Sequence, residues 1–342
     1  MSDALERMTS SQVWLALLTA FAAAIISAVV VRLIRPQLLK HALAKPNARS
    51  SHRTPTPQGA GIAVIAATLV IAAIVLLCTG ASTNFPAALF AATLFIAVVG
   101  FADDMKPIPV LPRLLLQAVA IGAIVLASPA DLRIVPVVPL WAERGLLVLA
   151  GLWFVNLVNF MDGIDWMTTA EVVPVTVAMT LLGLSGELPS SATIVAAALC
   201  GAMIGFAPFN RPVASIFLGD VGSLPIGLLL GWSLLQLALH HHPAAALLLP
   251  LYYLADATVT LFRRMMRREP FWVAHRSHFY QRATDNGFTV LQVVSRVFGL
   301  NLVLAVLAAV SIKAQSLSAY AALIAAGAAA VAFVMYRFSQ PR

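Results

Sequence analysis

Long apolar stretches recur along the whole chain and are separated by short polar segments. A helix needs about 20 apolar residues to cross a hydrocarbon core of roughly 30 Å. Because backbone polar groups in lipid must be paired within the segment itself, helices are the expected form of these stretches. The pattern predicts eleven transmembrane helices, at residues 11–34, 58–79, 86–101, 110–128, 144–161, 167–185, 191–208, 221–240, 244–262, 290–312 and 317–337.

The composition supports a membrane protein of one domain. Hydrophobic residues make up 61% of the 342 residues and charged residues 11%, whereas soluble globular chains average roughly 45–50% and 25%. No long soluble insertion or clear repeat interrupts the apolar stretches, so we expect a single all-α polytopic domain over residues 1–342. The first stretch is too long for a signal peptide and is followed by Arg32 and Arg35 without a cleavage site, which favours a retained helix.

The basic residues are distributed unevenly between the two predicted membrane faces. If the segment after the first helix is cytoplasmic, 18 of the 22 Lys and Arg residues lie on that side and 4 on the other. This bias predicts a periplasmic N-terminus and a cytoplasmic C-terminus in a bacterial inner membrane. The same bias accounts for the net charge of +8, so that charge does not indicate nucleic-acid binding. Cys78 and Cys200 lie in apolar stretches and indicate neither a disulfide framework nor a zinc site.

Acidic residues gather on the predicted cytoplasmic face. Five of the 14 carboxylates lie in three segments of that face that are far apart in sequence: Asp103, Asp104, Asp162, Asp165 and Asp220. Because the topology rests on Lys and Arg alone, this agreement is an independent indication of a site. The cytoplasmic segments that we expect to form it lie near residues 35–57, 102–113, 159–167, 209–222 and 263–289.

The first acidic segment is a pair of neighbouring aspartates, Asp103 and Asp104. Two adjacent carboxylates repel each other unless a cation or a basic side chain lies close by. The pair therefore indicates a bound cation or substrate. The alternative is a solvated helix end that Lys106 and Arg113 neutralise.

The segment NLVNFMDGIDW carries a polar side chain at every third position, namely Asn156, Asn159, Asp162 and Asp165. On an ideal helix this spacing drifts around the surface, so we expect Gly163 to break the helix and let the four side chains converge from a turn. Amide donors and carboxylate acceptors together suit a nucleotide and a hard cation. The alternative is a capped loop without a ligand.

Asp220 lies between Gly219 and Gly222, directly before an apolar helix. It could be a simple N-cap. Glycines at this place also allow the backbone to approach a phosphate at the helix N-terminus. The neighbouring Phe217 is placed to stack on a base.

The last long cytoplasmic segment is strongly basic. We interpret its first arginines as an anchor for anionic lipids: Arg263, Arg264, Arg267 and Arg268. The stretch HRSHFYQR at residues 275–282 differs, because it mixes His, Arg, Ser, Tyr and Gln. We expect its cationic donors to hold a pyrophosphate.

Two further polar features are left out of the predicted site. His240, His241 and His242 resemble a metal cluster, but they lie at the predicted outer end of a span, and consecutive residues do not share a helix face. Asp256 lies inside the ninth predicted span, where a lone carboxylate is costly and indicates function by default. It could instead pair with a basic residue near Arg263.

Five of these segments resemble, in order, the polyprenyl-phosphate N-acetylhexosamine-1-phosphate transferases of glycosyl transferase family 4, a superfamily that includes MraY, WecA and TagO. The resemblance runs from about residue 45 to residue 287. PNARSSHRTPTPQGAG is similar to the family's first cytoplasmic loop, and the aspartate pair followed by RLLLQ is similar to the family's own pair. NLVNFMDGIDW is similar to NxxNxxDGxDG, and FLGDVGS to a strand-free loop whose aspartate binds magnesium. Arg276 and His278 match the beginning of the family's histidine segment.

The resemblance implies transfer of an N-acetylhexosamine 1-phosphate from a UDP-sugar to undecaprenyl phosphate in the lipid bilayer, with release of UMP. The product would start an O-antigen or another cell-envelope polysaccharide. The implied cofactor is Mg²⁺, which Mn²⁺ could replace, with Asp220 as its ligand. The catalytic candidates are Asp103, Asp104 and His278. The implied substrate-binding residues are Asn156, Asn159, Asp162, Asp165, Phe217, Arg276 and His52. A homodimer is compatible with this interpretation.

Three features depart from the family pattern. Trp166 replaces a glycine, which could reshape the nucleotide pocket, and Tyr280 and Gln281 stand where further histidines are common. The HRxHxYQ variant resembles the WbpL-like branch that starts O-antigen chains, and eleven spans resemble that branch more than the ten-span MraY. The variant hints at a 6-deoxy sugar, while GlcNAc and GalNAc stay open.

Three alternatives remain. The first is the phospho-MurNAc-pentapeptide transferase of peptidoglycan synthesis. The second, from a different class, is an ion-coupled transporter, although transporter sites usually lie near the bilayer midplane and not at one membrane edge. The third is an inactive scaffold for polysaccharide assembly, which the intact aspartates disfavour.

Overall fold

The chain folds into a bundle of helices with one small sheet. The structure is a computed structural model that describes residues 10–44, 55–79, 86–270, 275–314 and 316–342. The sheet pairs β1 (Leu43–Ala44) antiparallel with β2 (Thr56–Pro57). The helices are α2 (Ser10–His41), α3 (Gly61–Cys78), α4 (Ala87–Met105), α5 (Val110–Ala127), α6 (Leu140–Met161), α7 (Met167–Leu184), α8 (Ser190–Phe206), the 3₁₀ turn η2 (Ala207–Phe209), α9 (Asp220–Leu239), α10 (Pro243–Leu248), α11 (Leu251–Met266), α12 (Phe279–Asp285), α13 (Val290–Ile312) and α14 (Leu317–Phe338).

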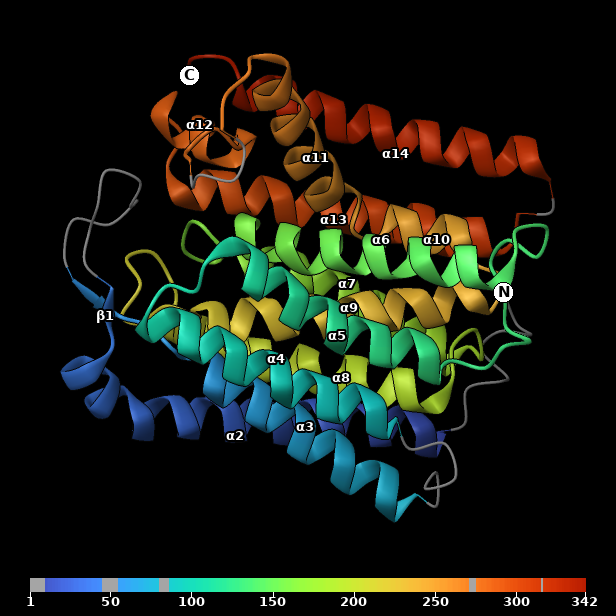
Figure 1. The fold of residues 1–342 in the computed structure, drawn as a ribbon, viewed down its shortest axis with the longest axis horizontal. Coiled ribbons are helices and arrows are strands. Elements are labelled where there is room, and N and C mark those ends of the chain that lie inside the picture. Colours follow the sequence, from blue (N-terminus) through green and yellow to red (C-terminus); the bar gives the residue numbers. More distant parts are fainter. Residues whose placement is uncertain (1–9, 45–54, 80–85, 271–274, 315) are drawn as a thin grey trace.

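Most of the long helices run side by side (Figure 1). Within the described residues, ten helices are long and apolar enough to cross a membrane. The large apolar side chains that remain exposed are most numerous on helices such as α2, α4 and α13, and these surfaces require lipid. The predicted all-α polytopic architecture is confirmed, and the protein is a multi-pass membrane protein.

The predicted ninth span, residues 244–262, is wrong as a single helix. The chain forms α10 and then α11, with a break at Leu249 and Pro250. Proline has no backbone N–H and its ring clashes with the preceding turn, so it opens a new helix more readily than it continues an old one. In Figure 1, α11 stands at a steep angle to the neighbouring helices.

Most other predicted ends lie within a few residues of the observed ones. Three helices are longer than predicted, because α6 begins at Leu140, α2 continues through Pro36 to His41 and α4 continues to Met105. Asp103 and Asp104 therefore occupy the last turn of α4 and are held by its backbone.

The acidic segments meet at one end of the bundle. The C-terminal ends of α4 and α6 lie there together with the N-terminal ends of α5 and α9. The segment before α9 is not free of strand pairing, which corrects the expected strand-free loop. Phe217 donates its N–H to the Pro57 carbonyl (2.8 Å), and its own carbonyl accepts from Gly59 (3.1 Å) and Ala60 (3.0 Å). These bonds tie the N-terminus of α9 to the chain that enters α3.

Candidate active site

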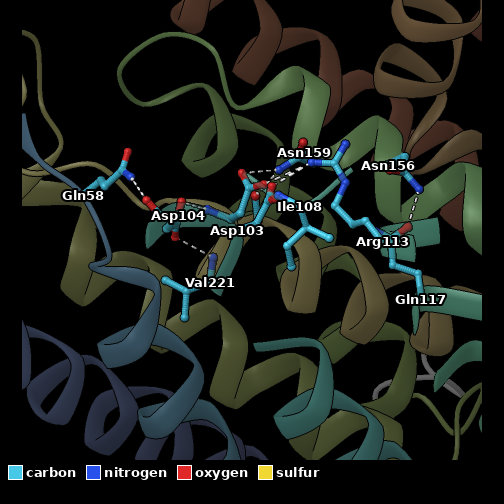
Figure 2. A network of polar contacts seen from close by, with 11 residues as sticks. Gln58, Asp103, Asp104, Ile108, Arg113, Gln117, Asn156, Asn159 and Val221 are labelled. Atoms are coloured by element: carbon cyan, nitrogen blue, oxygen red, sulfur yellow. Dashed lines mark hydrogen bonds and ion pairs between the residues drawn. The ribbon is translucent and has the colours of Figure 1, made fainter. Parts of the chain in front are cut away.

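Two aspartates from distant helices converge on one arginine. Asp103, on α4, accepts a hydrogen bond from the Ile108 N–H (2.6 Å) and another from Arg113 Nη1 (2.8 Å). The same Nη1 lies 3.7 Å from Asp220 Oδ2, at the first residue of α9. Figure 2 shows Asp103, Asn159 and Arg113 directed toward one another. Arg113 therefore supplies the positive charge that lets two like charges approach.

Asp104 points away from this pair and holds the N-terminus of α9. Its two carboxylate oxygens accept from the Asp220 N–H (2.9 Å) and the Val221 N–H (3.0 Å). Its carbonyl oxygen accepts from Gln58 Nε2 at 3.0 Å. The first N–H groups of a helix have no partner inside the helix and carry a partial positive charge, so a carboxylate there is stabilising. Asp104 thus fixes the position of Asp220.

Gly219 makes this contact possible. It adopts φ +76°, which side chains rarely allow, and a Cβ added there would lie 2.6 Å from Asp104 Oδ2. Any side chain at this position would push Asp104 away from α9. The glycine before Asp220 therefore serves a local contact, apart from any approach of a phosphate.

Asn159 orients the other side of Asp220. Its Nδ2 donates to Asp220 Oδ1 (2.7 Å) and to Ser223 Oγ (2.9 Å). Asp220 is thus held on one side by Asn159 and on the other by Arg113.

The four polar residues of NLVNFMDGIDW do not converge on one point, which corrects that expectation. Asn156 lies a turn deeper than Asn159 because α6 continues to Met161, and its Nδ2 donates to Gln117 Oε1 (2.6 Å). Asp162 accepts from the Thr168 hydroxyl, and Asp165 accepts from the Ala214 N–H (3.0 Å). The break near Gly163 is confirmed, but each side chain fixes a different segment.

Asp162 is the member of this group whose ionisation is most perturbed. Burial raises its pKa to about 7, and the neighbouring Asp104 and Asp165 act in the same direction. The Thr168 hydrogen bond opposes the shift without cancelling it. A group in this state is poised to bind a cation or a hydrogen-bond donor near neutral pH.

Trp166 stands at the position where the resembled family pattern has a glycine. It adopts φ 63° directly before α7, in the left-handed region that glycine reaches most readily. Its N–H donates to Asn210 Oδ1 (2.8 Å), and its indole N–H donates to the Ala207 carbonyl (2.6 Å). These bonds connect the beginning of α7 with η2. Its effect on a nucleotide pocket stays a prediction.

His278 is buried in a stack of rings and is held by Asp256. Its Nδ1 lies 3.2 Å from Asp256 Oδ1, and its ring lies 5.0 Å from the ring of His275 and 5.8 Å from that of Tyr280. Burial lowers the pKa of His275 to about 4, with His278 and Arg264 acting in the same direction. His275 is therefore neutral at physiological pH and can lie against His278 without charge repulsion.

Asp256, which the sequence left unassigned, is a buried carboxylate at the centre of a hydrogen-bond network. Instead of pairing with a basic residue near Arg263, it accepts from the N–H groups of Phe279 (3.0 Å) and Tyr280 (3.1 Å). Tyr252 (3.1 Å) and Thr260 (3.3 Å) add side-chain donors to the same carboxylate. A lone carboxylate inside an apolar span was the available indication, because such a group needs partners.

Tyr280 connects the histidine segment to the end of α6. Its hydroxyl donates to the Phe160 carbonyl (2.9 Å), and a Cβ added at Gly163 would lie 2.0 Å from that hydroxyl oxygen. Burial raises the pKa of Tyr280 well above its usual value, so the hydroxyl keeps its proton. The residue that departs from the family's histidine is thus matched to the glycine at position 163.

The close contact between Gly163 and the Tyr280 hydroxyl predicts that a substitution at one position can compensate for a substitution at the other. Gly163→Ala alone should lower the melting temperature, because the new methyl group would overlap the Tyr280 hydroxyl and cost on the order of 1–3 kcal/mol. Tyr280→Phe should cost about 1 kcal/mol through the lost hydrogen bond. The double variant should lose less stability than the sum of the two single losses, since the hydroxyl oxygen that would overlap the new methyl group is absent. Strict additivity in thermal unfolding of purified protein would show that the two positions do not interact.

The remaining predicted residues are not among the contacts of this centre that are described above. Arg276 contacts Thr284 Oγ1 (3.3 Å) and Asp285 Oδ1 (2.9 Å), and Phe217 is half-buried beside α9. His52 lies outside the described residues. His242, from the triplet set aside, lies 2.9 Å from Glu187 Oε2 at the opposite end of the bundle.

The oxygen ligands suit a magnesium ion. Among the described residues, no group of three or more His, Cys, Asp or Glu side chains is arranged around a common point. Mg²⁺ usually takes one or two carboxylates and completes its shell with water and substrate phosphates. Asp103 and Asp220, which already converge on one cationic nitrogen, meet that requirement.

Two comparisons relate this chain to known proteins. Residues 86–238 match the sequence model described as glycosyl transferase family 4. A phospho-N-acetylmuramoyl-pentapeptide-transferase from Bartonella quintana (strain Toulouse) is 29% identical over 175 residues, which are 46% of this chain and 48% of that relative. The chain thus spans about half the length of the curated relative that it matches. Both findings agree with the resemblance seen in the sequence.

Proposed function

We propose that the chain belongs to the polyprenyl-phosphate N-acetylhexosamine-1-phosphate transferase superfamily, glycosyl transferase family 4, and that it transfers a sugar 1-phosphate from a UDP-sugar to undecaprenyl phosphate. The observation that carries this proposal is the convergence of Asp103, Asp220, Asn159 and Arg113 from four helices at one end of a membrane bundle. A site at that edge can receive a soluble nucleotide while the acceptor's tail stays in lipid.

In this proposal an oxygen of the lipid phosphate forms a bond to the phosphorus that carries the sugar. The bond from that phosphorus to UMP breaks, and UMP leaves with the bridging oxygen. Asp103 deprotonates or positions the attacking phosphate, because it is the carboxylate held between the Ile108 N–H and Arg113. Arg113 limits the repulsion between the carboxylates and the incoming phosphates.

Asp220, with Asp103 beside it, would hold magnesium. When bound, the ion neutralises charge on the pyrophosphate. Asn159 keeps the Asp220 carboxylate oriented, and Asp104 keeps α9 in register with α4. We assign Asp104 this positioning role because both of its carboxylate oxygens already accept from the backbone.

The remaining residues of the site bind substrate in this proposal. Asp162 and Asp165 border the nucleotide, and Phe217 lies under the uracil. Arg276 and His278 contact the sugar phosphate. Asp256 fixes the ring of His278 through Nδ1, which leaves Nε2 as the atom available to a ligand.

Two sugar classes compete for this site. The HRxHxYQ variant favours an N-acetylhexosamine, and the match to a phospho-N-acetylmuramoyl-pentapeptide-transferase favours a phospho-MurNAc-pentapeptide. We favour the first, because Tyr280 and Trp166 occupy positions where the histidine and the glycine of the family pattern stand, and both make specific contacts here.

UMP release tests the proposal. Purified protein should form UMP and a lipid-linked sugar in equal amounts, and only with both undecaprenyl phosphate and Mg²⁺ present. A panel of UDP-N-acetylhexosamines together with UDP-MurNAc-pentapeptide would decide between the two sugar classes. If no UDP-sugar gives UMP while a proton gradient drives solute uptake into vesicles, the protein is a transporter.

A further inference from the structure

A cavity of about 770 Å³ lies between α11, α12 and α14, and the mechanism above does not use it. The α11 wall consists of Leu251, Ala255, Val259, Arg263 and Arg267. These residues follow one another at intervals of four, so they form a single stripe along the helix. The stripe begins with apolar side chains and ends with two arginines.

The α14 wall changes character in the same direction. Ala328, Val331 and Ala332 line its beginning, and Ser339 and Gln340 line its end. Both helices run toward the end of the bundle that carries α12 and the C-terminus (Figure 1). The cavity is therefore apolar toward the membrane interior and polar at the membrane edge.

The polar end is positively charged. The guanidinium of Arg263 lies 4.7 Å from the centre of the Phe279 ring, and that of Arg282 lies 5.9 Å from the same centre. Arginines on an aromatic face are attracted by its π electrons and keep their donors free for an anion. Three arginines and no acidic residue are among the described residues that line the cavity.

We propose that this cavity is a binding site for an anionic phospholipid of the surrounding bilayer. Its phosphate would lie at Arg263, Arg267 and Arg282, and an acyl chain would follow the apolar stripe toward Leu251. A soluble phosphate would leave the apolar walls uncovered, and a lipid without net charge would leave the arginines uncompensated. Four arginines of this segment looked like one diffuse lipid anchor in the sequence, but two of them belong to a defined groove.

The acceptor lipid is a less suitable occupant. None of the residues that line the cavity belongs to the Asp103–Asp220 network. Trp153 Nε1 donates to Thr258 Oγ1 (3.1 Å), so another part of α11 packs on α6, which carries Asn159.

The bound lipid would brace the histidine segment. Phe279 and Arg282 belong to α12, which begins directly after His278. A lipid that joins α12 to α11 and α14 would restrict the motion of His278. This consequence rests on the proposed function, so we expect anionic lipid to raise the transfer rate, whereas the binding itself can be tested without turnover.

The test compares lipid retention by full-length protein in native mass spectrometry after exchange into defined lipid. Wild-type protein should retain phosphatidylglycerol and release phosphatidylcholine. The double variant Arg263→Gln with Arg282→Gln should weaken retention by roughly thirtyfold, given about fivefold for each arginine near the surface. Arg268→Gln is the matched control, because Arg268 lies at the same helix end but does not line the cavity.

A second variant addresses the apolar half. Ala332→Trp should reduce retention by filling the groove, without removing any charge. Equal retention of the two lipids, or an equal effect of Arg268→Gln, would overturn the site. Exclusive retention of undecaprenyl phosphate would also overturn the phospholipid assignment. If the protein retains the lipid but releases no UMP, the proposed function is wrong and the lipid site stands.

Discussion

Asp220→Asn should lower the rate of UMP release by at least about a hundredfold, the scale of losing one charged group aimed at the reacting phosphates. The side chain keeps its shape but loses its negative charge, so it would lack the metal-binding carboxylate that the proposed mechanism requires. Its amide would also face Arg113 or Asn159 Nδ2, which now lie 3.7 Å and 2.7 Å from the carboxylate oxygens. The measurement is turnover of purified protein at saturating substrate and Mg²⁺.

Asp103→Asn should lose at least about a hundredfold as well, the low end for a positioned acid–base group. Asp131→Asn serves as the control, since Asp131 is exposed in the segment between α5 and α6. Melting temperatures of the three variants separate lost chemistry from lost folding. Near-normal turnover of Asp220→Asn at a normal expression level would remove Asp220 from the metal assignment, and a fewfold loss for Asp103→Asn would remove it from the catalytic residues.

Asp256→Asn should reduce both stability and turnover. The Asp256 side chain is fully buried and accepts from two backbone N–H groups and two hydroxyls. An asparagine has one accepting oxygen, and its NH₂ group would face donors that need an acceptor. Breaking a buried charged network of this kind costs on the order of 3 kcal/mol, so we expect a clear fall in the melting temperature. His278 would lose its Nδ1 partner, and turnover should fall by at least tenfold.

A milder change separates folding from positioning. Tyr252→Phe removes one donor to Asp256 and leaves the backbone contacts intact, so it should cost about 1 kcal/mol and little turnover. If Asp256→Asn lowers the melting temperature no more than Tyr252→Phe does, the carboxylate is not the anchor of the histidine segment. A loss of stability without any change in the pH profile of turnover would argue that His278 takes no part in the reaction.

Much of the bundle was predictable because lipid imposes simple rules. Helix length follows from membrane thickness, and ten of the eleven predicted spans were found as single helices. The division of the ninth span into α10 and α11 was missed, because a hydropathy average over many apolar residues does not register the single proline at position 250. The position of Asp104 inside α4 was missed because hydropathy falls before a helix ends.

The site was predictable as a set of residues and less so as an arrangement. Asp103, Asn159 and Asp220 were named from sequence, and the structure brings them together. Tyr252 and Thr260 lie one helical turn from Asp256, but its other partners belong to a turn more than 20 positions away, and spacing contains no information on such a contact. The same holds for Asn156, which faces Gln117 on another helix.

The contact between Asp104 and the beginning of α9 affects how genetic data on this chain should be interpreted. A genetic screen that measures only product formation would not distinguish residues 103 and 104, since a substitution at either position would abolish product formation. The two substitutions would nevertheless act differently. The one at position 103 removes a reacting group, whereas the one at position 104 allows α9 to shift relative to α4. A cross-link between cysteines placed on α4 and α9 in a cysteine-free background would separate the two, as its yield would fall only for the variant at position 104.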